Sequence, residues 1–394
     1  METEAALPVE FLTGQPYPAW AEGRGAGCPV AHHGSPYSGM EDREHYEILR
    51  FEDVEHVLRD WETFSSSING EHIGKFMGEF MLEMNGPEHR AYRGVVAHAF
   101  RASALERWDK ELVRPTIAAL LDAIAPLGKA ELVRDITTQY PVQVICGIAG
   151  VPLEDHEQFQ QWAEEVNTGP LNPKRGHAAS KAMRDYLAPL LEDRRANPRE
   201  DLISEMVHGE VDGHRLTDEK IYGFLRLLLP AGAETTFRAL GSALFALLTH
   251  PDELARVTTD RSLMPAVIEE TLRWETSVTQ VSRMAATDTE IAGCPIPAGA
   301  SLAVITGSAN HDEERYDDPD EWRLDRPTRP HMAFGTGPHQ CLGMHLARLE
   351  LRVGLDLILD RLPNLRLDAD EPMPVIQGQA FRGPTALPVL FDPN

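Results

Sequence analysis

The sequence contains few cysteines, and their positions narrow the classes of protein it can belong to. Only four of its 394 residues are cysteines, at positions 28, 146, 294 and 341. They lie far apart and show neither the paired spacing of a zinc site nor that of a secreted disulfide framework. This pattern favours a reducing compartment, and we expect a cytoplasmic protein.

Basic residues and long apolar runs are also scarce. Lys and Arg number 37 against 62 Asp and Glu, which gives a formal net charge of −25. Such a balance excludes the basic footprint of a nucleic-acid-binding protein and disfavours an anionic membrane surface. The most apolar stretch, residues 224–248, is interrupted by Arg226, Glu234 and Arg238, so no segment reaches the roughly 20 apolar residues of a membrane span. The acidic N-terminus lacks the pattern of a secretion signal.

The order of sequence patterns predicts a mainly α fold with a smaller β-rich region. Residues 1–44 are expected to form an irregular arm because residues 12–39 are rich in Gly and Pro, and residues 45–394 a single domain. Apolar residues spaced three and four apart predict helices over most of 86–260. Residues 285–310 predict short strands joined by Gly and Pro turns. A final helix is expected after Cys341.

The stretch FGTGPHQCLG, residues 334–343, carries the clearest chemical signal. Cys341 lies just ahead of the final helix, where the positive end of the helix dipole lowers a thiol pKa and favours a nucleophile or a metal ligand. Gly335 and Gly337 let the loop lie against a flat surface, and Gly343 removes a side chain there. Phe334 is expected to shield the sulfur from water. A simple buried cysteine in a turn would leave this pattern unexplained.

The pattern F-G-x-G-x-H-x-C-x-G, followed by MHLARLE, resembles the haem-binding loop of the cytochrome P450 family, the haem-thiolate monooxygenases. The resemblance implies the family's fold and one haem b, with Cys341 as the axial thiolate of the iron. Phe334, His339 and Gly343 would contact the cofactor, His339 at a propionate. A thiolate ligand pushes electron density onto iron and favours O–O cleavage.

Two further motifs resemble the same family. Glu270 and Arg273 in EETLRW match its Glu-x-x-Arg pair, which joins an arginine, here Arg326, to brace the haem-binding core. PAGAETTF matches its oxygen-binding helix, which makes Glu234 and Thr235 the acid and alcohol that relay protons to dioxygen. On residue type alone, a threonine hydrogen-bonded to its own helix remains an alternative.

The sequence also departs from the family pattern at two places. Pro230 lies inside the oxygen-binding helix, where it removes a backbone donor and favours a kink. His311 and Glu313 stand in SANHDEE where an arginine and a proline are more usual.

Cations and apolar side chains complete the expected site. His89, Arg93 and Arg283 match family positions that pair with haem propionates, as His339 does. The FRGPTALPV stretch near the C-terminus extends the resemblance over about residues 45–390. Candidate substrate-pocket residues are Ile73, Phe76, Leu228, Ala231, Val278, Thr279 and Ile376. They suit a small lipophilic substrate, and terpenoids, aromatics, fatty compounds and steroids stay open.

The resemblance implies a monooxygenase that uses O₂ to hydroxylate or oxidatively dealkylate its substrate. The chain shows no dinucleotide fingerprint and no iron–sulfur spacing. Electrons would therefore come from a ferredoxin and a ferredoxin reductase with NAD(P)H, and the protein is expected to be a monomer. A peroxide-driven peroxygenase and a non-enzymatic haem-thiolate sensor are the alternatives. Candidate cations for ferredoxin docking are Arg90, Arg101, Arg107, Lys110, Arg329, Arg348 and Arg352, with Arg101, Arg107 and Arg352 expected to be the most exposed.

Overall fold

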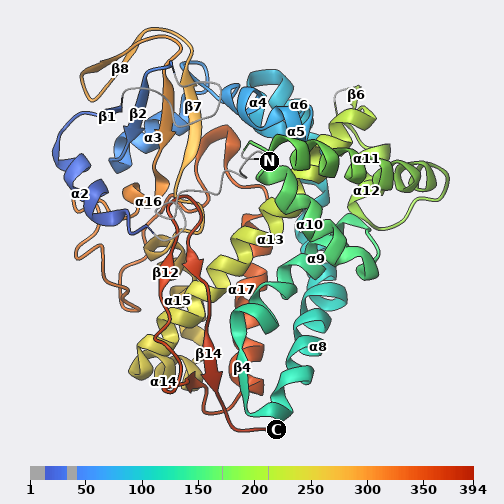
Figure 1. The fold of residues 1–394 in the computed structure, drawn as a ribbon, viewed down its shortest axis with the longest axis vertical. Helices are drawn as coiled ribbons and strands as arrows, with labels where there is room; N and C mark the ends of the chain where they lie inside the picture. Colours follow the sequence, from blue (N-terminus) through green and yellow to red (C-terminus); the bar gives the residue numbers. More distant parts are fainter. Residues whose placement is uncertain (1–13, 33–41, 171, 212) are drawn as a thin grey trace, which may run out of the picture.

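The computed structural model describes residues 14–32, 42–170, 172–211 and 213–394, and it confirms a large helical region with a smaller β-rich region (Figure 1). The α-helices are α2 (Tyr17–Gly25), α3 (Phe51–Arg59), α4 (Ile68–His72), α5 (Gly74–Met77), α6 (Gly86–Ala99), α7 (Ala102–Trp108), α8 (Arg114–Ile124), α9 (Gln139–Ala149), α10 (His156–Asn167), α11 (Pro173–Ala196), α12 (Leu202–His208), α13 (Asp218–Thr249), α14 (Pro251–Thr259), α15 (Met264–Trp274), α16 (Thr306–Ala309) and α17 (Met344–Arg361).

The strands are short and fall mostly in the first and last parts of the chain. They are β1 (Val30–His32), β2 (His45–Ile48), β3 (Phe64–Ser65), β4 (Lys129–Glu131), β5 (Glu210–Val211), β6 (His214–Arg215), β7 (Val281–Ala285), β8 (Thr289–Ile291), β9 (Cys294–Ile296), β10 (Ser301–Val304), β11 (Arg366–Leu367), β12 (Ile376–Gln377), β13 (Gly383–Pro384) and β14 (Pro388–Leu390). The largest sheet has the order β1-β2-β10-β7-β3, with β10 parallel to β2 and the other neighbours antiparallel.

Helix α13 runs through the middle of the helical region and determines how its neighbours pack (Figure 1). Thr217 caps its start by accepting a hydrogen bond from the Lys220 N–H at 3.3 Å. The helix continues unbroken through Pro230 to Thr249. Gly232 lets α9 approach closely, because a Cβ there would lie 2.8 Å from the Ile145 side chain. The central helix is therefore fixed by backbone contact at the level of the predicted oxygen-binding motif.

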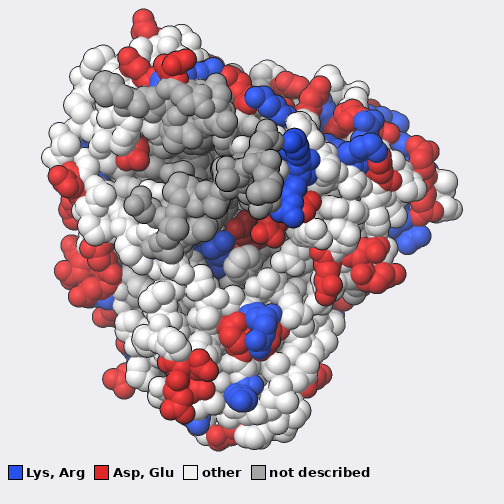
Figure 2. Space-filling model, in the orientation of Figure 1, with Lys and Arg blue, Asp and Glu red and all other residues white. Residues whose placement is uncertain are grey.

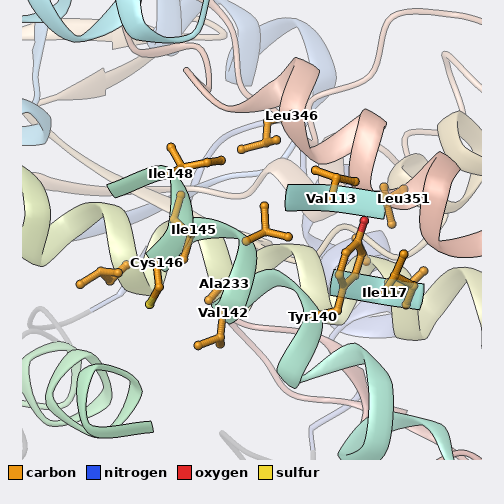
Figure 3. Packing of buried hydrophobic residues seen from close by; sticks show 14 of the residues in the cluster. Val113, Ile117, Tyr140, Val142, Ile145, Cys146, Ile148, Ala233, Leu346 and Leu351 are labelled. Carbon is orange, nitrogen blue, oxygen red and sulfur yellow. The ribbon is translucent and has the colours of Figure 1, made fainter. Parts of the chain in front are cut away.

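Apolar side chains fill the space between α9, α13 and α17 (Figure 3). Tyr140 and Ile145 of α9, Ala233 of α13 and Leu351 of α17 are all buried in this cluster. Each large aliphatic side chain buried in this way contributes roughly 1.5–3 kcal/mol. This packing holds α13 and α17 at fixed positions relative to each other.

The N-terminal arm was expected to be irregular, and its described part is not. Residues 17–25 form α2, which begins directly after Pro16, and Trp20 on this helix packs against Leu49, Ala303 and Ile305. The sequence pattern missed this helix because the surrounding Gly and Pro content outweighed a single buried aromatic residue. Residues 1–13 and 33–41 of the expected arm lie outside the described residues.

The expectation drawn from cysteine spacing is also wrong for one pair. The sulfurs of Cys28 and Cys294 form a disulfide, with Cα atoms 5.9 Å apart and a sequence separation of 266. The β8–β9 hairpin turns at Ala292 and Gly293, both at positive φ, and brings Cys294 to the segment that follows α2. Spacing along the sequence could not show this pairing, because it depends on tertiary contact. Cys146 and Cys341 remain free.

None of the helices among the described residues is both long enough and apolar enough to cross a bilayer.

A buried ion-pair network joins α15 to the chain that leads toward the cysteine loop. Glu270 pairs with Arg273 at 2.8 Å and with the Arg326 Nε at 2.9 Å. Arg273 also donates to the carbonyl oxygens of Asn310, Pro319 and Glu321. The structure thus brings together the three residues expected to brace the core.

We expect Glu270→Ala to lower the free energy of unfolding by about 3–5 kcal/mol, because it leaves two buried guanidinium groups without a counter-charge. Urea denaturation followed by circular dichroism measures this change. Glu253→Ala is a matched control: Glu253 forms the same i,i+3 pair with Arg256 at 2.7 Å, but with side chains 28% and 52% exposed, against 7% and 3% for Glu270 and Arg273. The control should change stability by less than about 1 kcal/mol, and equal losses in both variants would contradict the prediction.

Candidate active site

The cysteine loop takes a shape that depends on two of its glycines. Gly335 and Gly337 have φ of 61° and 72°, a region that other residues rarely adopt. A Cβ on Gly337 would also lie 2.5 Å from the Leu58 carbonyl oxygen at the end of α3. The Cys341 N–H closes the loop by donating to the Phe334 carbonyl at 2.8 Å.

The loop presents the Cys341 side chain to open space. Cys341 is exposed, and a Cβ on Gly343 would meet no atom within 4 Å. Phe334 packs beside the loop, with the Arg348 guanidinium 4.6 Å from its ring centre. A sulfur on an unobstructed surface, next to an aromatic ring, is an arrangement that can receive a flat cofactor.

The pKa of the Cys341 thiol is shifted in the opposite direction from the one expected. Desolvation by the surrounding protein raises the pKa of the Cys341 thiol, and the Gly343 N–H and the Arg93 and Arg348 cations lower it only in part. We expected a lowered pKa from the helix dipole. However, α17 begins at Met344, so Cys341 lies outside the first turn, and the dipole acts within that turn only.

Two imidazoles and two guanidinium groups gather beside the loop. The rings of His89 on α6 and His339 in the loop are 4.0 Å apart, and both Nε2 atoms are buried without a hydrogen-bond partner among the described residues. Burial and the neighbouring cations Arg93 and Arg283 lower the pKa of His89 to about 4 and that of His339 to about 3. Burial lowers the pKa of Arg283 to about 10.

These four groups lack a counter-anion among the described residues. The Arg93 guanidinium donates to the Gln340 carbonyl at 2.6 Å, and that of Arg283 to the Ser282 carbonyl at 2.8 Å. Neither arginine forms a salt bridge with a described carboxylate. Buried donors left in this state are costly, and two carboxylates from a ligand would satisfy them.

Glu234 and Thr235 lie on α13 at the level of Gly232. The Thr235 hydroxyl donates to the Ala231 carbonyl at 2.7 Å, which is the back-bonded arrangement that remained an alternative from the sequence. Its oxygen can still accept hydrogen bonds. Ala231, on the same side of the helix, is exposed. The Glu234 carboxylate is half-buried, so this part of α13 is accessible to water.

Arg238 is a site residue that the sequence reasoning missed. Its guanidinium pairs with Glu234 at 2.8 Å, donates to the Phe381 carbonyl at 3.4 Å and lies 5.0 Å from the Phe237 ring centre. The sequence contained a signal for Arg238, because Glu234 and Arg238 are four residues apart and such residues share a face of a helix. Arg238 connects the candidate proton-relay acid with the C-terminal turn.

The candidate pocket residues do not all have free surface. Ala231 is exposed, Ile73 and Val278 are partly exposed, and Leu228 is buried. Thr279 is buried, and its hydroxyl donates to the Gln379 and Ala380 carbonyls; Ile376 is buried in β12.

Phe76 is a core residue, not a pocket surface. It is 4% exposed and belongs to the main apolar cluster. A Cβ on Gly169 or Gly176 would lie within 3 Å of its ring, so the ring fills a slot between α10 and α11. Its place in the expected pocket is therefore corrected.

Comparison with known proteins agrees with this geometry. Residues 38–381 match the family model for cytochrome P450. The chain is 35% identical over 323 residues to a steroid C26-monooxygenase of Mycolicibacterium smegmatis, with 80% of each chain covered. It is 32% identical over 406 residues to the cytochrome P450 monooxygenase PikC of Streptomyces venezuelae, covering 98% of this chain and 93% of that protein. The crystal structure of CYP109E1 from Bacillus megaterium with testosterone superposes with a TM-score of 0.84 at 29% identity, covering 96% and 99% of the two chains.

Three features are those of a haem-thiolate enzyme. They are the helical region around α13, the cysteine loop shaped by two glycines, and the buried Arg283, which has no carboxylate partner among the described residues. The chain belongs to the cytochrome P450 family and is a monooxygenase whose cofactor is haem b. The residues present fit that group, because the orphaned nitrogens of His89 and His339 and the buried Arg283 match its two propionates.

Proposed function

We propose that this protein hydroxylates or oxidatively dealkylates a small lipophilic substrate with O₂ and with electrons from a separate ferredoxin. One observation carries the proposal: the exposed Cys341 lies beside the buried His89 and Arg283 and the partly buried His339 and Arg93, which have no counter-anion among the described residues. When bound, a thiolate-ligated haem supplies the activation of O₂ for insertion of one oxygen atom into a C–H bond.

The protein side chains then have separate tasks. Cys341 would ligate the iron, and His89, Arg93, Arg283 and His339 would hold the propionates by charge-assisted hydrogen bonds. Phe334 and Gly343 would contact the ring, Phe334 by covering the sulfur.

The proton relay is assigned to Glu234 and Thr235. The Thr235 oxygen, which already donates to Ala231, would accept a hydrogen bond from a water molecule and hold it near the reacting oxygen. Glu234 is accessible to solvent and would exchange protons with it. Its ion pair with Arg238 must open, or rearrange, when the carboxylate turns toward Thr235.

The redox partner would dock on the face of the protein that carries the cysteine loop. The chain has a formal net charge of −25, and Figure 2 shows acidic side chains spread over one face of the molecule. An acidic ferredoxin therefore needs a local basic patch at the docking face. Four of the candidate cations, Arg90, Lys110, Arg329 and Arg352, are exposed and form no salt bridge with a described residue. Arg90 also lines a cavity of about 420 Å³ with Trp61, Arg93 and Pro338, beside the cysteine loop.

Arg101 is exposed, as expected, but it pairs with Glu205 at 3.4 Å. The expectation for Arg107 is wrong, because Arg107 pairs with Glu200 at 2.9 Å and its side chain is only 28% exposed. Arg348 pairs with Glu269 at 2.6 Å, and Arg329 donates to the Arg315 carbonyl. The docking group is therefore narrowed to Arg90, Lys110 and Arg352.

The relatives indicate which substrates to test first. One is named as a steroid C26-monooxygenase, and CYP109E1 was crystallised with testosterone. Steroids therefore head the panel, followed by terpenoids, alkyl or methoxy aromatics and fatty compounds. We also propose a single catalytic domain over residues 45–394, a monomer, and a cytoplasmic location on the basis of the family resemblance.

Two alternatives can be separated from this proposal by turnover. A peroxygenase would form product with hydrogen peroxide alone at the rate seen with ferredoxin, reductase and NAD(P)H. A haem-thiolate sensor would form no product under either condition and would still bind CO. The Glu234–Thr235 pair favours the O₂-dependent reaction, because peroxide brings its own protons.

Cys341→His should abolish the strongly red-shifted Soret band of the ferrous CO complex, because imidazole donates electron density less strongly than a thiolate. A difference spectrum of the reduced protein with CO minus the reduced protein without CO measures this band. Cys146→Ser, which changes the other free cysteine, should keep it. A variant at 341 that retains the band would show that the sulfur is not the ligand.

Thr235→Ala should consume NAD(P)H at a similar rate but release hydrogen peroxide in place of product, because the water that delivers the proton is no longer held. Product, peroxide and NAD(P)H are measured together to give the coupling. Thr249→Ala is the control: Thr249 makes the same i−4 hydrogen bond on the same helix, at 2.8 Å to the Phe245 carbonyl. Unchanged coupling in both Thr235→Ala and Glu234→Gln would place the proton path elsewhere.

Arg90→Glu combined with Arg352→Glu should lower ferredoxin-supported turnover about tenfold at low salt and flatten its salt dependence. Substrate binding and the CO spectrum should not change. The double variant Arg215→Glu with Arg366→Glu makes the same charge change on strands β6 and β11, which carry none of the docking cations, and serves as the control. If both double variants slow turnover equally, net charge and not a docking patch determines the rate.

A further inference from the structure

A buried arginine on α13, Arg226, lies one turn before Pro230 and is outside the relay described above. It is 5% exposed. Its Nη1 donates to the Met77 carbonyl at 3.0 Å and its Nη2 to the Ser180 carbonyl at 2.9 Å. Its Nε is buried without a partner, and no described carboxylate forms a salt bridge with it. Burial lowers the pKa of Arg226.

The segment after α5 passes very close to α13 at this point. A Cβ on Gly223 would lie 2.0 Å from the Glu79 carbonyl oxygen, so only glycine permits the crossing. Gly78 has φ of 80°, and a Cβ there would lie 3.3 Å from the Arg226 Nη1. The backbone of residues 77–79 is therefore shaped to meet the guanidinium.

Helix α11 is attached to the same place by a second contact. The Ser180 hydroxyl donates to the Phe76 carbonyl at 2.6 Å. The Phe76 ring lies in the slot formed by Gly169 and Gly176, with the His177 ring 4.7 Å away. Residues from α5, the α10–α11 connection, α11 and α13 thus meet around one cation.

We propose that Arg226 is a positioning residue that sets the roof of the substrate pocket by clamping α5 and α11 to α13. We call the group of Arg226, Phe76, Met77 and Ser180 the latch. The proposal rests on the proposed function, in which Ile73, next to the latch, faces the pocket. With the latch closed, a bulky ligand has to wait for the roof to open, whereas a small ligand does not.

The chemistry of the latch suits a contact that opens and re-forms. An apolar side chain of similar volume would pack here without the desolvation cost of a guanidinium. The acceptors are backbone carbonyls on two separate elements and not a carboxylate, so each bond is weaker than a buried ion pair. When the roof opens, water replaces the two carbonyls as hydrogen-bond acceptor for Arg226. The guanidinium group of arginine is more weakly hydrated than the ammonium group of lysine.

Arg226→Met is the direct test, with the ferric haem-loaded protein and two ligands of different size. Stopped-flow mixing with 4-phenylimidazole should show association and dissociation rate constants both increased about tenfold, since two charge-assisted hydrogen bonds no longer hold the roof. The rate constants for cyanide should stay within twofold of the unsubstituted protein. Hydrogen exchange should become faster in residues 73–79 and 176–182.

Two further variants complete the test. Ser180→Ala removes one hydroxyl and keeps Arg226, so it folds even if Arg226→Met does not, and it should raise the 4-phenylimidazole rate constants about threefold. Arg184→Met is the matched control: Arg184 on α11 pairs with Glu219 on α13 at 2.6 Å, but both side chains are exposed and neither reaches α5. It should leave the ligand rates unchanged.

The proposal is overturned if the 4-phenylimidazole rate constants in both Arg226→Met and Ser180→Ala stay within twofold of the unsubstituted protein. It is also overturned if Arg184→Met, or the cyanide rates, change as much as the Arg226→Met values for 4-phenylimidazole. Failure of the proposed function has a different signature. In that case the unsubstituted protein shows no red-shifted Soret band in its ferrous CO complex, or it forms no product. The dependence of the ligand-binding rates on ligand size, and the hydrogen exchange, still report on the latch.

Discussion

One buried carboxylate, Glu270, holds two guanidinium groups, and the cysteine loop depends on that arrangement. With Glu270 in place, Arg273 can orient the carbonyls of the 310–321 segment. Within that segment the Asn310 side-chain oxygen accepts a hydrogen bond from the Met332 N–H at 2.6 Å, two residues before the loop begins. The buried ion-pair network of Glu270 is costly to break, and its hydrogen bonds are satisfied in only one geometry. It therefore fixes where Cys341 can lie.

Helix α13 serves packing and chemistry with different faces of one element. Gly232 brings it against Ile145, and this close contact leaves no freedom for the helix to shift. Glu234 lies on the opposite face, whereas Thr235, three residues after Gly232, lies beside it on the helix surface. Both side chains are partly exposed to water, as proton transfer requires. Several of the polar residues that interrupt its apolar sequence have partners: Arg226 donates to the Met77 and Ser180 carbonyls, and Arg238 pairs with Glu234. The Ser242 hydroxyl, in contrast, is buried without a partner among the described residues.

The sequence was sufficient to predict those parts of the site in which the interacting residues lie close together in the chain. The ten residues of the cysteine loop, and pairs three apart such as Glu270 and Arg273, predict their own geometry because the spacing decides which side chains meet. Contacts between distant segments were not predictable in this way. The sequence pattern predicted that Phe76 lines the pocket, but its ring packs against Gly169 and Gly176. It also predicted that Arg107 is a free cation, but Arg107 pairs with Glu200.

Two of the departures of this chain from its family pattern, His311 and Glu313, lie against α2, the helix that the sequence did not predict. His311 stacks on Tyr17 at 4.1 Å, and Glu313 pairs with Arg24, so α2 covers both unusual positions. Tyr17 also donates to Glu275, which pairs with the fully buried Arg382 at 2.8 Å. Arg382 follows Phe381, whose carbonyl accepts a hydrogen bond from Arg238, the partner of Glu234. The N-terminal helix is thereby connected, through one buried ion pair and one turn, to the acid of the candidate proton relay.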